Sequence, residues 1–364
     1  MAPRQTNGDD RLGLEGGQTN GDGRRGRPAK RMVMRVVAAP DKFRGTATAA
    51  DVAAAIARAA RACGWDCDEV PLADGGEGTL DVLGGANRST LVTGPLGDPV
   101  RAGWQLRDRR AVIEMATASG LELVGGPEGN DPVAASTYGT GELISAAIDA
   151  GARRILVGVG GSATTDGGLG ALRAMFPLPR VRGVEVEVAC DVRTSFVDAA
   201  DLFAPQKGAT PAQVELLRRR LQRLVQVYLD EHGVDVLALP GAGAAGGLAG
   251  GLAAAGATLV EGFDLVAEEA GLDEALEGAD LVITGEGFLD EQSFDGKVVG
   301  GVVERASAKG VPVIVIAGEV YDDAADRVDA ESLVEQFGEQ RAKGDPLACI
   351  EAVVSARLCS RPPS

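Results

Sequence analysis

The chain contains, at residues 155–168, the stretch Ile-Leu-Val-Gly-Val-Gly-Gly-Ser-Ala-Thr-Thr-Asp-Gly-Gly. Its first five residues are apolar or glycine, which is typical of a strand that is buried on both faces. The glycines that follow predict a tight turn whose backbone N–H groups can approach a ligand closely. A buried strand that ends in such a loop indicates an α/β sheet, in which ligands bind at the carboxyl ends of the strands.

The same pattern of an apolar run followed by a loop recurs along the chain. Further strands are predicted at residues 33–39, 68–72, 184–190, 234–239, 281–284 and 311–317. Helical patterns lie between them, and residues 90–114, with their Gly-Pro and Asp-Pro turns, predict a β-ribbon. The sequence therefore predicts an α/β fold with a largely parallel sheet, and a second, less regular domain within residues 90–270.

The composition limits the kinds of function that are open to this chain. A net charge of −17 disfavours non-specific binding of nucleic acid by the folded body. His232 is the single histidine, so a Ser–His–Asp triad or a multi-histidine metal site would have to be built on that one residue. The five cysteines have no paired metal-ligand spacing, and reduced thiols are expected. No membrane segment or signal peptide is apparent, so we expect a cytoplasmic protein.

Residues 1–31 are polar, glycine-rich and without periodicity, which predicts a disordered tail. The tail ends in the basic stretch Arg-Arg-Gly-Arg-Pro-Ala-Lys-Arg at residues 24–31, which is similar to an AT-hook core. It carries only seven basic against four acidic residues, so we expect a solvated tail and no nucleic-acid partner. Met32 and Met34 are alternative starts of the chain.

Acidic residues follow the predicted strands at Asp41, Asp74, Glu77, Asp166, Asp191, Glu286 and Asp290. Carboxylates beside phosphate-binding loops repel phosphate unless a cation lies between them, which favours a Mg²⁺–nucleotide ligand. The same loops carry the basic residues Lys42, Arg44, Lys207 and Lys297, which suit a transferred phosphoryl group. No loop matches a Walker A motif or a dinucleotide-binding Gly-x-Gly-x-x-Gly, so P-loop nucleotidases and Rossmann dehydrogenases are disfavoured.

Seven motifs together resemble the bacterial glycerate kinase family. They include Ala-Pro-Asp-Lys-Phe-Arg-Gly at residues 39–45 and Ala-Asp-Gly-Gly-Glu-Gly-Thr at 73–79; the others lie at residues 160–168, 189–192, 205–210, 240–247 and 283–287. The resemblance implies a Rossmann-like or flavodoxin-like domain, residues 33–85 plus 275–364, with an inserted α/β domain at residues 86–274. The site would lie in the cleft between the two domains. It also implies phosphorylation of D-glycerate by ATP and Mg²⁺, with 2-phosphoglycerate as the favoured product.

Roles for individual residues follow from this resemblance and from the chemistry. Asp191 is the expected base for the glycerate hydroxyl, with Lys42 or Lys207 stabilising phosphoryl charge. Arg44 suits the glycerate carboxylate, and further substrate contacts are expected from Asp41, Asp74, Glu77 and Ser162. The nucleotide would lie against Gly160, Gly161, Gly243, Gly246, Gly285 and Glu286, and the metal candidates are Asp166 and Asp290.

Four departures from the family pattern keep two alternatives open. Thr165 replaces an asparagine, Phe288 replaces an arginine, and the segment between Gly170 and Val184 is shorter than usual. After Asp191, the residues Arg-Thr-Ser-Phe at 193–196 replace an Asn-Pro-Leu turn. The alternatives are a kinase for another small hydroxy acid, and a catalytically weak relative with a binding or regulatory role. The sequence does not indicate an oligomeric state.

Overall fold

The computed structural model describes residues 33–43, 45–178, 183–294 and 296–360. The predicted tail and the candidate Arg44 lie outside these residues. Two β-sheets organise the described part, and the strands of each are parallel except at one edge of the second.

Strands from both ends of the chain form the five-stranded sheet, in the order β11-β10-β9-β1-β2, with every pair parallel. The central strands β1 and β9 are buried on both faces, which explains why they read as uninterrupted apolar runs. The strands are β1 (Arg35–Ala38), β2 (Asp66–Glu69), β9 (Leu281–Leu289), β10 (Val313–Val320) and β11 (Ala330–Ser332).

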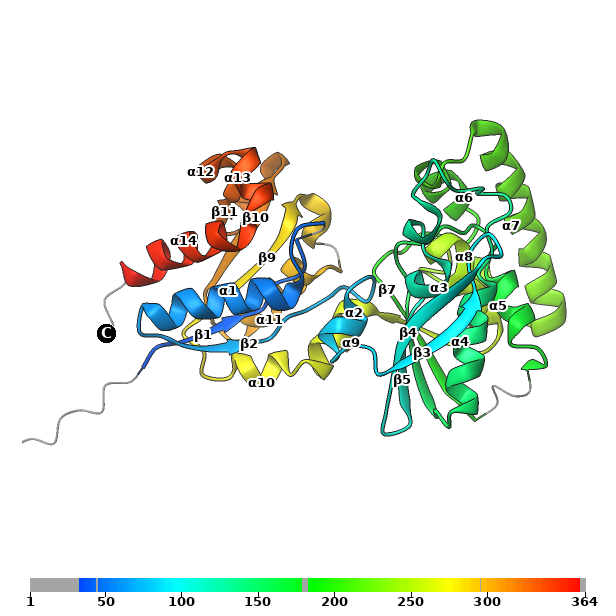
Figure 1. The fold of residues 1–364 in the computed structure, drawn as a ribbon, viewed down its shortest axis with the longest axis horizontal. Coiled ribbons are helices and arrows are strands. Elements are labelled where there is room, and N and C mark those ends of the chain that lie inside the picture. The colour runs from blue at the N-terminus through cyan, green and yellow to red at the C-terminus, as the bar shows by residue number, and fades with distance from the viewer. Residues whose placement is uncertain (1–32, 44, 179–182, 295, 361–364) are drawn as a thin grey trace, which may run out of the picture. The chain divides into compact units, whose positions relative to one another are not determined.

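Helices cover both faces of this sheet (Figure 1). On one face, α1 (Ala49–Ala62) packs beside α14 (Pro346–Cys359), over Val36 and Ile283. A capping box of Thr48 and Asp51 begins α1. The other face is covered by α9 (Gly262–Glu269), α10 (Leu272–Leu276) and α11 (Val298–Ala308), and the short helices near the C-terminus are α12 (Leu333–Phe337) and α13 (Glu339–Gly344).

The six-stranded sheet has the order β3-β4-β5-β6-β7-β8. Its first two pairings are antiparallel and form the predicted ribbon, whereas the pairings from β5 to β8 are parallel. The strands are β3 (Arg88–Thr93), β4 (Pro99–Arg107), β5 (Arg110–Glu114), β6 (Arg154–Gly158), β7 (Glu185–Cys190) and β8 (Thr258–Glu261).

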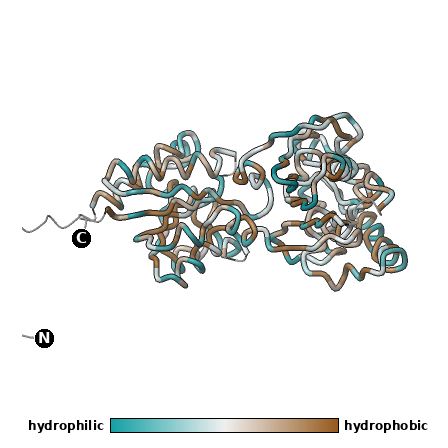
Figure 2. Tube along the Cα trace, turned by 90° about the horizontal axis from the view of Figure 1, so that it is seen from below, coloured by the Kyte–Doolittle hydropathy of each residue, from teal (hydrophilic) through white to brown (hydrophobic). Residues whose placement is uncertain are grey.

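The largest apolar core lies on one face of this second sheet, under its helices. Hydrophobic and hydrophilic residues alternate along the helical parts of the trace, as expected for helices that bury one side only (Figure 2). The helices over this core are α3 (Ala116–Ser119), α4 (Tyr138–Asp149), α5 (Leu169–Ala174), α6 (Ala199–Phe203), α7 (Pro211–His232) and α8 (Ala244–Ala254). The opposite face packs against α2 (Thr79–Val82) and α9.

The mixed α/β fold predicted from the sequence is confirmed, but one strand prediction is wrong. Residues 234–239 contain the 3₁₀ helix η4 (Val236–Ala238), begun by Asp235, whose carboxylate accepts from Leu237 N at 3.0 Å. The strand that pairs with β7 is instead β8. It has only four residues, the first and last of which are polar, so its sequence shows no clear strand pattern. The other 3₁₀ helices are η1 (Glu122–Val124), η3 (Pro205–Lys207), η5 (Glu291–Phe294) and η6 (Asp322–Asp326). No helix among the described residues is long and apolar enough to cross a membrane.

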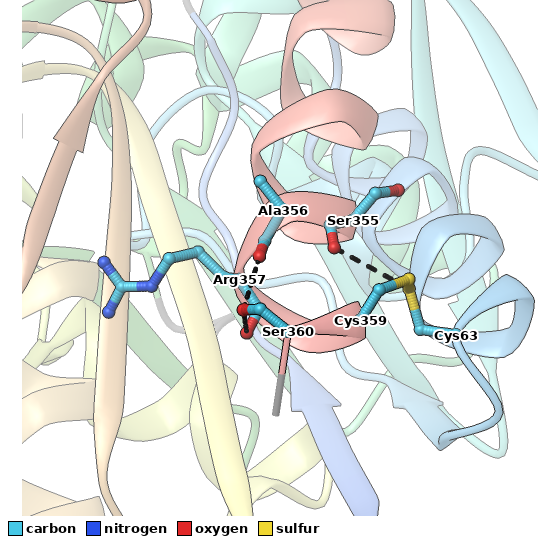
Figure 3. Close-up of a disulfide and its surroundings, with 6 residues drawn as sticks. All are labelled: Cys63, Ser355, Ala356, Arg357, Cys359 and Ser360. Atoms are coloured by element: carbon cyan, nitrogen blue, oxygen red, sulfur yellow. Dashed lines mark hydrogen bonds between the residues drawn. A yellow bond between two sulfur atoms is a disulfide. The ribbon is translucent and has the colours of Figure 1, made fainter. Parts of the chain in front are cut away.

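A disulfide joins Cys63, at the end of α1, to Cys359, at the end of α14 (Figure 3). The prediction that all the thiols are reduced is therefore wrong for this pair. The two cysteines are 296 residues apart in sequence, so only the packing of α1 on α14 brings them together. Arg58 and Glu351 pair across the same two helices at 2.5 Å. The disulfide thus fixes the C-terminal helix to the first helix of the chain.

Replacing Cys359 with serine should lower the free energy of unfolding by about 2–4 kcal/mol, because the bond closes a long loop in the unfolded chain. Urea unfolding, followed by circular dichroism with and without reductant, measures this change. The wild type in reductant should match the variant, and reductant should not alter the variant further. Equal urea midpoints for the oxidised wild type and the variant would contradict the prediction.

Candidate active site

Carboxylates follow strands of both sheets at their carboxyl ends. Asp41 follows β1, Asp191 follows β7, and Glu286 lies in the last part of β9. Asp41 N donates to Gly285 O at 2.8 Å, which places Asp41 and Glu286 on neighbouring strands. Asp74 lies on the connection that leads from β2 to α2.

The carboxyl groups of Asp74 and Asp191 lie close enough to interact. Burial and, to a smaller extent, the negative charge of Asp74 raise the pKa of Asp191 to about 6, although the charge of Lys297 opposes the rise. A carboxylate with such a pKa is ionised at neutral pH and still basic enough to accept a proton in a transition state. Asp191 also lines a cavity of about 1080 Å³, together with Arg193, Phe263 and Phe294. The predicted base is therefore half-buried, close to a second carboxyl group and open to a cavity of ligand size.

Glu286 belongs to a second group of acids, with Asp41 and Asp290 nearby. Burial, with smaller contributions from the charges of Asp41 and Asp290, raises the pKa of Glu286 to about 7. A hydrogen bond from Ser293 and the charge of Lys297 act in the opposite direction. One oxygen of Glu286, Oε1, is buried and has no hydrogen-bond partner in the described part of the chain.

Lys297 lies within electrostatic range of both groups of acids. It is the N-cap residue of α11, and a Cβ added to the preceding Gly296 would lie 3.6 Å from Asp191 O. The turn before α11 therefore runs along the end of β7. Within the described residues Lys297 forms no ion pair closer than 4.0 Å, so its ammonium is available to an anionic ligand.

Lys42 lies at a second cavity, of about 670 Å³, which is also lined by Glu77, Gly78 and Glu114. Its ammonium donates to Glu77 O at 2.6 Å, and its backbone N–H donates to Asp41 Oδ1 at 2.7 Å. Lys42 therefore connects the loop after β1 to the loop that carries Asp74.

Lys207 is almost completely buried, with 3% of its surface exposed. Its ammonium donates to Ser162 Oγ at 2.7 Å and to Thr164 O at 2.6 Å. Burial lowers the pKa of Lys207 to about 7, and the charge of Asp166 opposes the change. Lys207 thus holds the glycine-rich loop after β6 from inside the protein.

Asp166 is engaged by its own chain. Its carboxylate accepts from the backbone N–H groups of Thr137 at 2.9 Å and of Gly168 and Gly170 at 3.1 Å, and from the Thr137 hydroxyl. These donors organise the turn into α5 and occupy both oxygens. No interaction links Asp166 to Asp290, the other predicted metal ligand, in the described residues.

The glycine-rich loops approach other backbone segments closely. At Gly246, where φ is +69°, an added Cβ would lie 2.0 Å from Thr164 O, and at Gly243 it would lie 2.3 Å from Ser195 O. At Gly285 it would lie 2.0 Å from Ile316 O, and at Gly160 it would lie 3.2 Å from Gly76 Cα. These glycines therefore allow the loops of the site to pack against one another, whatever they bind.

The residues fit a magnesium ion held jointly with nucleotide phosphates better than an all-protein metal site. Among the described residues, no three acidic, histidine or cysteine side chains gather closely enough to hold a metal. Mg²⁺ usually takes one or two carboxylates and completes its shell with phosphates and water. The orphaned oxygen of Glu286, with Asp290 beside it, offers such a carboxylate, whereas Asp166 does not.

Sequence reasoning missed Glu114, and it named Lys297 only as one of the basic residues that suit a transferred phosphoryl group. Glu114 ends β5 and is 8% exposed, although it is charged. A glutamate directly after the apolar residues 111–113 was the available signal, because a strand buried on both faces seldom ends in an unpaired charge.

Carboxylates and lysines at the ends of parallel strands are the groups that a phosphotransferase site needs. The chain belongs to the glycerate kinase family, whose model matches residues 36–176 and 177–351. It is 40% identical over 330 residues to the glycerate 2-kinase of Escherichia coli (strain K12), covering 80% of this chain and 86% of that one. It is 41% identical over 325 residues to a glycerate kinase of Halalkalibacterium halodurans, covering 78% and 85%. The crystal structure of a protein assigned as glycerate kinase 2 from Salmonella typhimurium LT2 superposes with a TM-score of 0.74 at 35% identity, covering 90% of this chain and 98% of that one.

Proposed function

We propose that the protein transfers the γ-phosphoryl group of ATP to O2 of D-glycerate, giving 2-phosphoglycerate and ADP. The observation that carries the proposal is the half-buried carboxyl group of Asp191, which lines a cavity of about 1080 Å³ and has Asp74 and Lys297 in electrostatic range. Phosphoryl transfer needs a base for the hydroxyl and positive charge around the phosphoryl oxygens, and this arrangement supplies both.

In this mechanism Asp191 accepts the proton of the attacking hydroxyl, and Lys42 and Lys297 stabilise the charge on the phosphoryl oxygens. Lys207 contributes from its buried position, because it fixes Ser162 and the loop that contains Gly160 and Gly161. Contacts to glycerate are proposed for Asp41, Asp74, Glu77 and Ser162, and for Arg44. We retain Gly243, Gly246 and Gly285 as walls of the nucleotide site.

When bound with ATP, Mg²⁺ would neutralise charge on the phosphates. Glu286 and Asp290 are the residues proposed to hold it, because Glu286 has a buried oxygen without a partner. We further propose that residues 33–85 with 275–364 and residues 86–274 are two domains with the site between them, and that the reaction takes place in the cytoplasm.

The test is ADP release from ATP–Mg²⁺ with D-glycerate, with the product identified by phosphorus NMR. We expect turnover of about 1–100 s⁻¹, the usual range for kinases, and a phosphomonoester on O2. A signal from 3-phosphoglycerate would correct the position of transfer, and absence of any phosphoglycerate would refute the proposal.

One observation favours a second substrate, a more apolar hydroxy acid. Phe288, two residues after Glu286, has 45% of its surface exposed and stacks on Tyr321 with ring centroids 6.0 Å apart. This exposed aromatic pair, close to Glu286 of β9, can contact an apolar group of a substrate. An arginine at position 288 would instead favour a carboxylate. A panel of hydroxy acids with longer apolar side chains, assayed beside D-glycerate, distinguishes the two substrates by their kcat/KM values.

A further inference from the structure

Glu114 is a buried charge that contacts the loop of Asp74. It is the last residue of β5 in the six-stranded sheet, and its Oε1 accepts from Leu80 N at 2.6 Å. The backbone N–H of Gly78 also bonds to this carboxylate. Two N–H groups at the start of α2 are thus held by one side chain that is 8% exposed.

The segment held by Glu114, residues 74–80, connects the two sheets, since it follows β2 and precedes β3. Gly76 N donates to Asp74 Oδ1 at 3.1 Å, so the conformation of the segment orients the Asp74 carboxylate. Lys42, which follows β1, holds the same segment through Glu77 O at 2.6 Å. The segment is therefore fixed from the five-stranded sheet by Lys42 and from the six-stranded sheet by Glu114.

We propose that Glu114 is a positioning residue for phosphoryl transfer, which holds the 74–80 segment so that Asp74 stays paired with Asp191. The expected effect on phosphoryl transfer rests on the proposed function. The expected effect of Glu114 on the conformation of residues 74–80 does not. Glu114 bonds to the backbone beside Asp74, and Asp74 in turn faces the base. A carboxylate holds these N–H groups more strongly than a neutral amide does, because charge-assisted hydrogen bonds are about twice as strong as neutral ones.

The charges around Glu114 argue that its position has a function beyond packing. Burial raises the pKa of Glu114, and the nearby charges of Asp81 and Glu77 raise it further, whereas the bonds from Leu80 and Gly78 lower it. A purely structural anchor for a helix start needs no buried charge among other acids, since a serine, threonine or asparagine serves at ordinary helix starts. The cavity lined by Glu114 and Lys42 also reaches the loop from the side of β1.

Glu114→Gln is the test, with Glu142→Gln as its matched control. Glu142, on α4, accepts from Thr93 N at 2.6 Å, so both changes weaken hydrogen bonds that backbone N–H groups donate to a carboxylate. Of these two glutamates, only Glu114 contacts the 74–80 segment. The measurements are kcat, KM and the pH profile of kcat/KM for glycerate phosphorylation, together with hydrogen–deuterium exchange at residues 74–80.

For Glu114→Gln we expect kcat to fall about 10- to 100-fold with little change in KM, in the range of positioning effects. The acid limb of the profile should move to lower pH, because Asp191 loses part of the like charge of Asp74 that raises its pKa. Lys297, which also faces Asp191, is unchanged in both variants. Exchange should quicken at residues 74–80 in Glu114→Gln and remain at the wild-type rate there in Glu142→Gln.

Two results would overturn the inference: a pH profile for Glu114→Gln that coincides with that of Glu142→Gln, or unchanged exchange at residues 74–80. If the wild type does not phosphorylate glycerate, the proposed function fails while the exchange data still decide whether Glu114 holds the segment. Faster exchange confined to Glu114→Gln would then support the positioning role, and equal exchange in the two variants would remove it.

Discussion

Asp191→Asn should lower kcat by about 10³-fold and leave the protein folded. Loss of a general base typically costs 10²–10⁴-fold in rate, and asparagine keeps the size of the side chain. The amide cannot accept the hydroxyl proton, whereas the binding of ATP depends on other residues. Steady-state phosphorylation of glycerate measures the first effect, and nucleotide binding by calorimetry tests the second.

The same change should stabilise the protein at neutral pH. Burial raises the pKa of Asp191 from its ordinary value to about 6, so the folded state binds this proton more tightly than the unfolded state does. Stability is therefore lost as the pH rises towards 6, and at about 1.4 kcal/mol per pKa unit the loss reaches about 3 kcal/mol. Asparagine mimics the protonated side chain, so the variant should gain this amount above pH 7 and nothing below pH 4.

Asp74→Asn is the matched control for both measurements. It removes a like charge that raises the pKa of Asp191 and leaves the proposed base in place. We expect an acid limb of kcat/KM at lower pH and a smaller loss of kcat than in Asp191→Asn. Near-normal turnover of Asp191→Asn, or a larger loss in Asp74→Asn, would assign the base to another residue.

The order of strands and loops could be predicted because its causes are local. The apolar runs at residues 155–159 and 281–284 are strands in the structure, since central strands of a parallel sheet are buried on both faces. The acids after them could be placed for the same reason, because parallel strands end at one edge of a sheet. Asp191 and Glu286 thus lie where strand patterns alone indicate.

The other features depend on contacts between distant parts of the chain. Nothing near Lys207 in sequence indicates that it is buried, since its partners Ser162 and Thr164 are more than forty residues away. The Cys63–Cys359 bond likewise requires α1 to pack on α14. Glu114 acquires its importance only when the segment after β2 folds over the end of β5. The sequence alone does not show which residues these side chains contact in the folded protein.

Lys207→Met should lower kcat by about 10²-fold or more, although the lysine is buried. Methionine has a similar length but no donors, so Ser162 Oγ and Thr164 O lose their bonds to the ammonium. A buried acceptor without a partner costs about 1–3 kcal/mol, and the loop can relieve this cost by moving. Since Ser162 is proposed to contact glycerate, a loop that moves loses the geometry on which transfer depends.

The pH dependence of the free energy of unfolding distinguishes this explanation from one in which Lys207 is exposed to solvent and contacts the substrate directly. Burial lowers the pKa of Lys207 to about 7, so between pH 7 and 10.5 the unfolded state binds a proton that the folded state does not. Wild-type stability should therefore rise with pH across this window, by several kcal/mol at about 1.4 kcal/mol per pKa unit.

Urea unfolding of Lys207→Met should lack that rise. Lys343→Met, at an exposed lysine paired with Glu339, should keep both the rise and the activity. If Lys207→Met shows the wild-type slope, the lysine is solvated in solution, and its effect on kcat would then come from direct contact with substrate.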